Sequence, residues 1–311
     1  MTARAIPAPL PRIARPSVRR RTDRRGTLVE VWLRTHAIGS YLFLYVPIAV
    51  VVLFAFNDTQ GVAARWEGFS TRWFNVALGD PVVLKSLANS FIVAIPNAIL
   101  ATAFGTMAAL GLQRASRRVR TVFDGLTYMS VIVPEVVIAL ATLVLFATGF
   151  DLIETMTGVK VKLGYPTIIA AHVLFNTSLV LLLVRARLSG MDRTLVDASA
   201  DLFATPWRTF RQITFPQLLP AIVAGFLLSF TFSFDDYVIT TFVSGPGSST
   251  LPLFIFGQVR RGVTPETNAI ATMILGFTLG MLLVGQAVVK WQSRRAGRRG
   301  DGDIASIVTE S

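Results

Sequence analysis

Six long apolar runs, separated by polar segments, constrain the fold of this 311-residue chain more than any other feature. Each is long enough to cross a bilayer as a helix, which takes about 20 mostly apolar residues. The runs cover residues 37–56, 87–112, 122–149, 166–185, 217–243 and 268–289. The first run is too long for a cleaved signal peptide and has no small-residue cleavage site after it. We therefore predict an all-α integral membrane protein with six transmembrane helices.

The basic residues predict how these helices are oriented. The net charge of +12 is concentrated beside the apolar runs, with nine arginines in residues 1–34, four from Arg114 to Arg120 and five basic residues from Lys290 to Arg299. Such clusters mark the cytoplasmic side of a membrane and do not indicate nucleic-acid binding. We predict that both termini and the segments 113–120 and 186–216 are cytoplasmic. The loops 57–86, 150–165 and 244–267 should face outward.

The remaining composition limits the domain organisation and the chemistry. Residues 1–36 are predicted to form a basic, disordered cytoplasmic tail near anionic lipid, residues 37–290 a transmembrane domain, and residues 291–311 a second cytoplasmic tail, disordered after Arg299. The absence of cysteine excludes disulfides, iron–sulfur clusters and thiolate zinc sites. No Gly-rich phosphate loop is present, so the chain should neither hydrolyse ATP nor hold a cofactor. No nucleophile, base and orienting group are expected to converge, and His172 should be a hydrogen-bonded packing residue.

The most unusual connection is the polar block 197–216, DASADLFATPWRTFRQITFP, between the fourth and fifth apolar runs. Apolar residues at helical spacing, with Thr205 as a helix N-cap and Pro206 as a first helical residue, predict two short amphipathic helices. Pro216 is expected to end the second helix. Such a pair, attached directly to a span, suits docking to a partner protein. The alternative is a helix lying on the lipid surface, with Trp207 among the headgroups.

This block resembles the EAA loop of permease subunits of bacterial ABC importers. Asp197-Ala198-Ser199 stands at the Glu-Ala-Ala of the motif, and Ile213-Thr214-Phe215-Pro216 stands at its Ile-x-Leu-Pro. Asp replaces Glu, Ser replaces Ala, and Phe203 occupies the usual Gly position. The Phe argues against a left-handed turn there, which would move the corner to Ala204-Thr205.

Further segments resemble the spermidine/putrescine type of these permeases. They include residues 228–238 and 242–246, Leu251-Pro252-Leu253, residues 263–269, and residues 66–70 with Trp73-Phe74 in the first outer loop. The resemblance covers roughly residues 37–290 and is most specific in 191–272. It implies a bacterial cytoplasmic-membrane importer with a second, related permease subunit, two ATPases that hold ATP and Mg, and an extracytoplasmic binding protein. Polyamine is the implied cargo.

The same resemblance implies a role for the cytoplasmic block as the helix pair that couples the ATPases to the spans. Aromatic and apolar side chains would enter the ATPase cleft, and charged side chains would form its rim. The anchors would be Leu202, Phe203 and Trp207. The rim would be Asp197, Asp201, Arg208 and Arg211, with Ala198, Ser199 and Pro216 completing the motif.

The acidic residues in the spans predict the path of a cation. An acid at mid-bilayer costs at least about 2.5 kcal/mol and marks either a function or a structural pair. Glu135 follows Pro134, which leaves the carbonyl of Ser130 without its helical donor. Asp235 and Asp236 point about 100° apart on a helix, so one is expected to line the path while the other caps a helix or pairs. Tyr237, with Phe232 and Phe234, offers either cation–π contact or packing.

Other functions remain open at this stage. A related permease could carry ferric iron, thiamine, sulfate or an organic solute, although an oxyanion carrier should have basic or helix-N-terminal donors in its spans. An ion-coupled secondary transporter or a cation channel should show repeat symmetry or a charged ring, and would have no use for the 197–216 block.

Overall fold

The computed structural model describes residues 24–61, 65–192 and 194–309, and this part of the chain is helical except for loops and one isolated β-bridge between Asn57 and Phe69. Six helices in it are long and apolar enough to cross a membrane, which confirms the predicted fold class. These candidate spans are Val29–Phe54, Pro81–Arg114, Glu135–Thr157, Tyr165–Ser189, Pro206–Phe234 and Pro265–Ala287.

The chain divides into two compact units, residues 1–50 and residues 51–311. The described part of the first unit belongs to helix α1 (Arg24–Phe54), on which every side chain from Val29 to Val50 is exposed. Residues 24–36, which we predicted to lie in a basic tail, belong to this helix. Residues 1–23 lie outside the described part.

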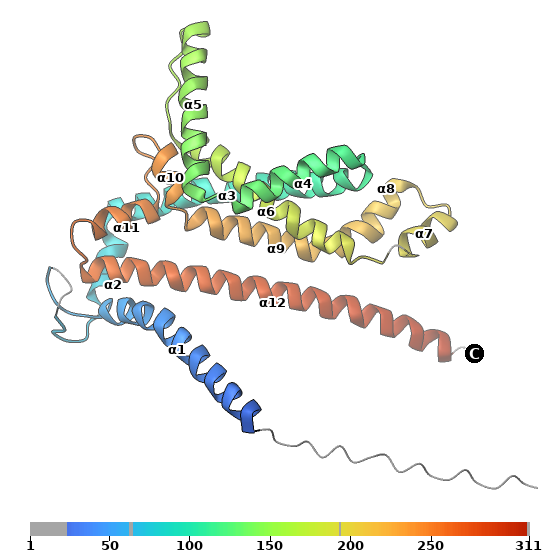
Figure 1. Ribbon diagram of the computed structural model, residues 1–311, viewed down its shortest axis with the longest axis horizontal. Coiled ribbons are helices and arrows are strands. Elements are labelled where there is room, and N and C mark those ends of the chain that lie inside the picture. Colours follow the sequence, from blue (N-terminus) through green and yellow to red (C-terminus); the bar gives the residue numbers. More distant parts are fainter. Residues whose placement is uncertain (1–23, 62–64, 193, 310–311) are drawn as a thin grey trace, which may run out of the picture. The chain divides into compact units, whose positions relative to one another are not determined.

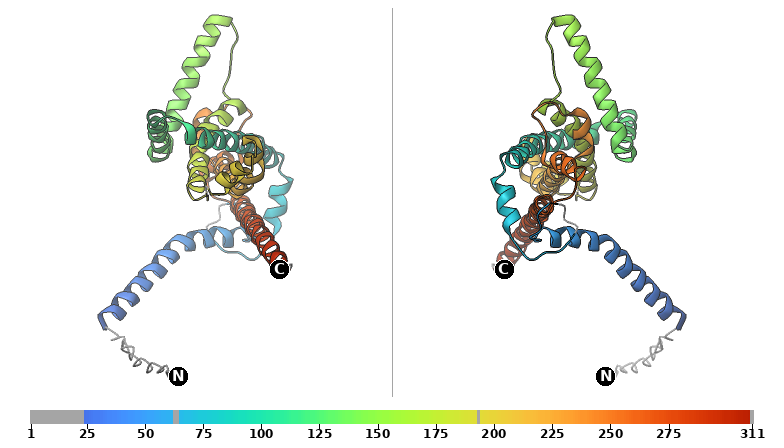
Figure 2. Two further views of the ribbon diagram at one scale, coloured as in Figure 1. Left: turned by 90° about the vertical axis from the view of Figure 1, so that its right-hand side faces the viewer. Right: turned by 90° about the vertical axis from the view of Figure 1, so that its left-hand side faces the viewer.

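In the second unit, α3 (Pro81–Arg114), α6 (Tyr165–Ser189) and α9 (Phe215–Phe234) pack against one another and form its centre (Figures 1 and 2). Where α3 and α6 approach most closely, a Cβ added to Gly105 would lie 2.7 Å from the Cβ of Val180. Leu181, Val184 and Leu218 are buried at this contact. The close approach explains why a glycine stands inside an apolar helix.

The third apolar run is not one helix, contrary to the sequence analysis. Helix α4 (Arg117–Ile132) ends before Pro134, and α5 (Glu135–Thr157) starts after it as the apolar span. Val133 is extended, with φ −65° and ψ 132°. Proline removes a helical donor and disfavours helix in the preceding residue, so the run divides at this position.

The fifth run also differs from its prediction. Helix α9 ends at Phe234, and a separate short helix, α10 (Val238–Val243), follows after a three-residue break. Two further short helices, α2 (Arg72–Gly79) and α11 (Leu251–Val259), lie in the segments predicted to face outward. The last helix, α12, runs from Pro265 to Thr309. This helix includes most of the tail that we predicted after Arg299.

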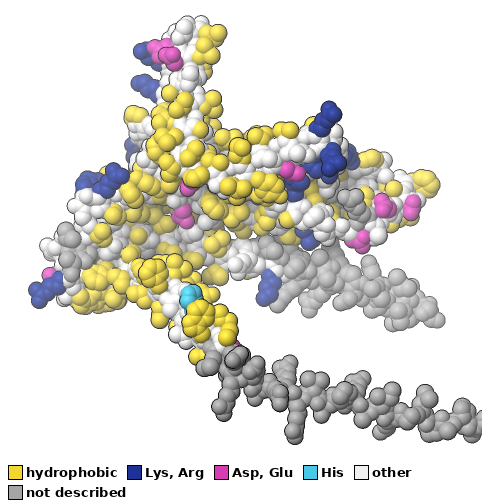
Figure 3. Space-filling view, viewed as in Figure 1, with side chains coloured by type: hydrophobic (Ala, Val, Ile, Leu, Met, Phe, Trp, Pro, Cys, Tyr) yellow, Lys and Arg dark blue, Asp and Glu magenta, His cyan; other side chains and the backbone are white. Residues whose placement is uncertain are grey.

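The surface of the described helices is largely apolar (Figure 3). On α5, Val144 and Leu145 are each 63% exposed, and on α4 the side chain of Ile132 is 78% exposed. Exposed apolar area of this extent is typical of a chain that contacts lipid or other subunits. Basic and acidic side chains instead gather toward helix ends in this view.

Candidate functional site

The block between α6 and α9 forms the predicted helix pair, and we call residues 194–216 the docking segment. Helix α7 (Thr194–Asp201) comes first, followed by a corner and α8 (Pro206–Thr209). Thr205 is the N-cap of α8 and Pro206 is its first residue, which confirms the predicted start of the second helix. The docking segment therefore has two helical parts joined by four residues.

The second helix does not stop at Pro216, contrary to the sequence analysis. A π-helical turn, η1 (Phe210–Thr214), joins α8 to α9, and residues from Pro206 to Phe234 form one candidate span. The backbone N–H of Phe215 donates to the carbonyl of Phe210, five residues earlier. Pro216 then falls in the first turn of a new α-helical segment, where a missing N–H is tolerated.

The corner is a Schellman motif built on Phe203, which has φ +57° and is the only non-glycine residue with positive φ in the described part of the chain. The N–H of Phe203 donates to the carbonyl of Ala200 (2.9 Å), and the N–H of Ala204 donates to that of Ser199 (3.0 Å). These are the two hydrogen bonds of that motif. The predicted corner at Ala204-Thr205, with Phe203 helical, was wrong. Satisfying the last carbonyls of α7 outweighs the steric cost at the Cβ of Phe203.

The corner presents unpaired apolar side chains to the surroundings. Phe203 is 97% exposed, Leu202 is 80% exposed and Trp207 is 69% exposed. The ring of Trp207 stacks on that of Phe210 at 5.7 Å, which orients the indole. The predicted rim residues and the rest of the motif are also exposed, namely Asp197, Ala198, Asp201, Arg208, Arg211 and Pro216. The segment therefore carries an apolar patch, formed by Leu202, Phe203 and Trp207, within a charged border.

A hydrogen bond that sequence reasoning missed holds the two helical parts together. Ser199, which stands at an Ala position of the motif, is buried, and its Oγ lies 2.7 Å from the Oγ1 of Thr209. Thr209 Oγ1 also donates to the carbonyl of Thr205. The Ser199–Thr209 pair therefore fixes α7 against α8. In the sequence, this hydrogen bond is indicated by Thr209, a second hydroxyl residue ten positions after Ser199.

The two spans that flank the docking segment are bonded to each other. At the start of α7, the backbone N–H of Thr194 donates to Oδ1 of Asp192 at 2.9 Å, and hydrogen bonds from the Thr194 side chain and then its backbone lower the pKa of the Asp192 carboxyl. The guanidinium of Arg187, near the end of α6, donates to the carbonyl of Gln217 on α9 at 2.9 Å. Leu218 is fully buried against α6 side chains. The segment is therefore held at the ends of two packed helices.

The three acids predicted for the cation path, Glu135, Asp235 and Asp236, lie in different surroundings. Asp236 is buried, and its carboxylate accepts backbone N–H bonds from Ile239 (3.3 Å) and Thr240 (2.7 Å), so it caps α10. Asp235 is exposed, and the hydroxyl of Thr278 lies 3.5 Å from its Oδ2. Glu135 is half-buried in the first turn of α5. The capping role expected for one aspartate thus belongs to Asp236.

Glu135 and Asp236 line one small cavity of about 10 Å³, together with His172 and Asn176. By this measure the cavity holds about one water molecule. Tyr237, at the N-cap of α10, stacks on Phe256 with ring centroids 4.0 Å apart. Phe234 is buried and packs in the core, whereas Phe232 is 47% exposed.

His172 is buried and hydrogen-bonded, which confirms its prediction as a packing residue. Its Nδ1 lies 2.7 Å from Ser233 Oγ, and its Nε2 lies 3.0 Å from Asp236 Oδ2. The hydroxyl of Thr240 also donates to Asp236 at 2.7 Å. These contacts join three helical elements through buried polar side chains. All of these side chains are buried, and the adjoining cavity is too small for a substrate, so the cluster ties α6 to α9 and α10.

Similar proteins agree with this architecture. The chain is 40% identical over 246 residues to the putrescine transport system permease protein PotI of Escherichia coli K12, covering 79% of this chain and 86% of the relative. It is 32% identical over 261 residues to the spermidine/putrescine transport system permease protein PotC of the same strain, covering 84% of this chain and 94% of the relative.

Solved structures show the same fold at low sequence identity. The first is a bacterial ABC transporter involved in the import of the acidic polysaccharide alginate, with a TM-score of 0.71, 13% identity, and coverage of 86% of this chain and 96% of that one. The alginate transporter in complex with its pentasaccharide-bound periplasmic protein gives a TM-score of 0.68 at 15% identity, over 88% of this chain and 96% of that one.

The family model of the binding-protein-dependent transport system inner membrane component matches residues 101–298, which is more than half of the chain. The matched region contains the docking segment, the acids and five of the six candidate spans in whole or in part. This chain therefore belongs to the family of inner membrane components of binding-protein-dependent transport systems.

Proposed function

We propose that this chain is the permease subunit of an ATP-driven importer that moves a polyamine across the bacterial cytoplasmic membrane by alternating access. The observation that carries the proposal is its similarity, over about four-fifths of its length, to two permeases named for putrescine and for spermidine/putrescine. Acids at the ends of candidate spans support a cationic cargo: Glu135 begins one span, and Asp235 directly follows the end of another.

The docking segment is the proposed contact with the ATPases. Its support is the exposed apolar patch, the charged border and the attachment to α6 and α9. A cleft in a moving partner can bind the aromatic side chains of a rigid helix pair. The partners in this proposal are a second permease subunit, two ATPases that bind ATP and Mg, and an extracytoplasmic binding protein. The binding-protein complex of the alginate transporter supports that arrangement.

Glu135 and Asp235 are the proposed acids of the cation path, with Tyr237 beside them. Asp235 is exposed and makes a single long hydrogen bond, so its carboxylate is free to meet an ammonium group. The carboxylate of Asp236 accepts hydrogen bonds from four donors, including His172. We therefore assign Asp236 a structural role beside the path.

Uptake of labelled putrescine and spermidine by cells with and without this gene tests the proposal. Uptake should fall when the gene is deleted, and should return with the wild-type chain but not in cells lacking the partner ATPase. Unlabelled polyamines should compete, whereas thiamine and ferric iron should not. Uptake that persists without the ATPase would refute the ATP-driven mechanism, and competition by thiamine or iron alone would refute the cargo.

A second experiment tests the acids. The variants Glu135→Gln and Asp235→Asn should each slow uptake while the transporter still assembles, and Asp58→Asn, in the first outer loop, is the matched control. Uptake equal to wild type in both acid variants would refute the proposed path.

A further inference from the structure

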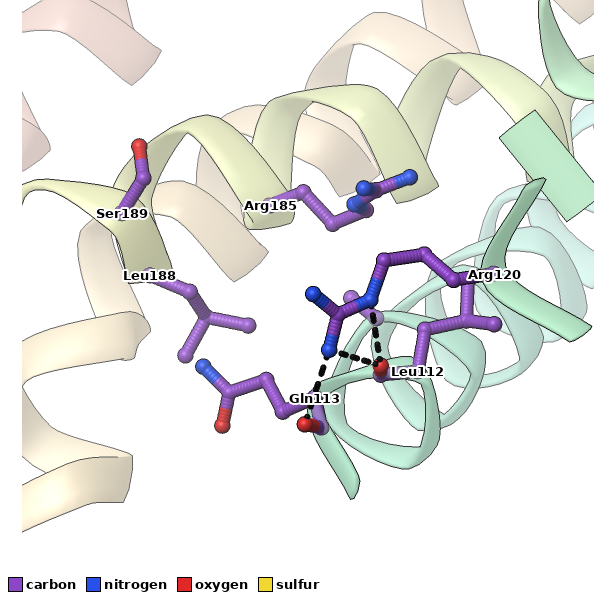
Figure 4. Close-up of a pocket in the computed structure, with 7 residues that line it drawn as sticks. Leu112, Gln113, Arg120, Arg185, Leu188 and Ser189 are labelled. Atoms are coloured by element: carbon purple, nitrogen blue, oxygen red, sulfur yellow. Dashed lines mark hydrogen bonds between the residues drawn. The ribbon is translucent and has the colours of Figure 1, made fainter. Parts of the chain in front are cut away.

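A cavity of about 170 Å³ lies between the ends of α3, α4 and α6, away from the acids and outside the docking segment. One water molecule needs only about 10–15 Å³ by the same measure, so the cavity holds a polyatomic group. Its polar lining consists of Arg120, Arg185, Gln113 and Ser189 (Figure 4). No acidic side chain lines it.

Arg120 is only partly used by the fold. Its Nε and Nη2 donate to the carbonyl of Leu112 at 3.3 and 3.1 Å, and Nη2 also donates to that of Gln113 at 3.0 Å. These bonds cap the last turn of α3. The other terminal nitrogen, Nη1, donates to no acceptor in the described part of the chain. Because a guanidinium has five N–H groups, Arg120 retains donors for an anion.

The opposite wall adds a second donor, although its charge is balanced by an ion pair. Arg185, on α6, binds Asp124 of α4 through both terminal nitrogens, which leaves its Nε–H free. In Figure 4, the Gln113 side chain extends from α3 into the space between Arg120 and Leu188. Planar guanidinium groups and amide N–H groups that converge from three helices suit phosphate oxygens.

Two observations point to a lipid as the source of the phosphate. The cavity lies at the ends of the candidate spans Pro81–Arg114 and Tyr165–Ser189, where a bilayer places its headgroups. Beside Arg120, α4 exposes an apolar stripe at helical spacing, formed by Val119, Val122, Phe123 and Leu126. A soluble anion would leave this stripe uncovered, whereas the acyl chains of a lipid would cover it.

The surrounding charge favours an anionic lipid over a zwitterionic one. Arg114, Arg117 and Arg118 lie on the same two helix ends, and within the described residues their side chains form no ion pair or hydrogen bond. Each Lys or Arg near a membrane surface adds attraction to anionic headgroups.

We propose that this cavity binds the phosphate of an anionic phospholipid, whose acyl chains lie along α4. The bound lipid would brace the end of α6, since Leu188 and Ser189 line the cavity and the docking segment begins five residues after Ser189. The proposal rests on the membrane location of the family and does not depend on the cargo.

Native mass spectrometry of the full-length chain in detergent tests the site, with phosphatidylglycerol and phosphatidylcholine of identical acyl chains as probes. We expect wild type to retain one phosphatidylglycerol about tenfold more tightly than phosphatidylcholine. Arg120→Gln should weaken phosphatidylglycerol binding about ten- to a hundredfold, and Gln113→Leu about two- to tenfold. Arg261→Gln, on an exposed side chain that follows α11 and lies outside the cavity lining, should change it less than twofold.

Equal retention of phosphatidylglycerol by wild type, Arg120→Gln and Gln113→Leu would overturn the proposal. Displacement of the lipid by millimolar inorganic phosphate would also overturn it, since the site would then belong to a soluble anion. Should Arg120→Gln aggregate on size exclusion, Gln113→Leu decides, because it keeps the backbone carbonyl that Arg120 caps. The measurement uses neither ATPase nor cargo, so its failure is distinct from failure of the proposed transport.

Discussion

Phe203 is an aromatic residue at a left-handed corner, which should affect both the stability of the chain and its affinity for the ATPase. Substitutions of Phe203 separate these two effects. A φ of +57° costs a residue with a Cβ about 1–2 kcal/mol relative to glycine, and the greater freedom of glycine in the unfolded chain cancels part of this difference. Phe203→Gly should therefore be more stable than Phe203→Ala by about 1 kcal/mol. Because the ring is 97% exposed, Phe203→Ala itself should unfold within about 0.5 kcal/mol of wild type.

Affinity for the ATPase should depend on the phenyl ring of Phe203 and not on the backbone conformation at this position. Burying a fully exposed phenylalanine in a cleft contributes about 1.5–3 kcal/mol, which is roughly a 12- to 150-fold change in affinity. Both variants lose the ring, so both should bind the partner ATPase more weakly by that factor. The affinity is measured by titrating the ATPase onto the purified, membrane-reconstituted chain, and polyamine uptake is measured in parallel.

Stability and ATPase affinity, measured on the same variants, test the two effects separately. Met156→Ala, which removes a 77% exposed apolar side chain at the far end of α5, is the control and should leave ATPase affinity unchanged. Wild-type affinity in both Phe203 variants would refute the anchor. A Gly variant less stable than the Ala variant would refute the left-handed corner. Loss of uptake without loss of affinity would place the role of Phe203 after docking.

Four other substitutions test the fold around the site. Ser199→Ala and Thr209→Val should each lower the free energy of unfolding by about 1 kcal/mol, and the double variant by less than the sum, as measured in a thermal double-mutant cycle. Asp236→Asn should destabilise the chain by about 2–4 kcal/mol in the same melts, because it disturbs four buried hydrogen bonds; a change below 1 kcal/mol would refute its capping role. Gly105→Ala should cost about 1–3 kcal/mol by forcing α3 away from Val180, and an unchanged melting temperature would contradict that contact.

The sequence predicted features that depend on local composition. Runs of about 20 apolar residues have few alternatives to a membrane helix, so the six spans were found even where their ends differ. Thr205 and Pro206 predicted the start of α8 because both residues act within one helical turn. These predictions needed no knowledge of distant contacts.

Other features depend on competition between backbone hydrogen bonding and the preference of an individual residue, which that residue alone does not reveal. Pro134 divides the third run, whereas Pro216 does not end a helix, because a π turn lies before Pro216 and no such turn lies before Pro134. Phe203 takes a conformation that phenylalanine disfavours, because the corner satisfies the carbonyls of Ser199 and Ala200. In each case hydrogen bonding by neighbouring backbone groups outweighed the preference of the residue itself.

The hydrogen-bond partners of His172 could not be predicted, and the reason here is distance along the chain. Its partners, Ser233 and Asp236, lie 61 and 64 residues away along the chain, so only the packing of α6 against α9 brings them together. That packing depends on side-chain volumes, such as Gly105 against Val180, which a hydropathy pattern does not contain. The same packing separates Asp235 from Asp236, which are adjacent in sequence but differ in exposure.

The second half of the docking segment continues into the helix that ends directly before Asp235 and Asp236, and this constrains how the two regions can communicate. Pro206 to Phe234 comprises 29 residues, or about 43 Å at 1.5 Å per residue. The Schellman corner and the Ser199–Thr209 bond fix one end, and the bonds from His172 and Thr240 to Asp236 fix the other. If an ATPase moves the docking segment, the displacement reaches the acids through this helix without an intervening loop. The π turn at Phe210–Thr214 is the place where the helix departs from α geometry, so any bending should concentrate there.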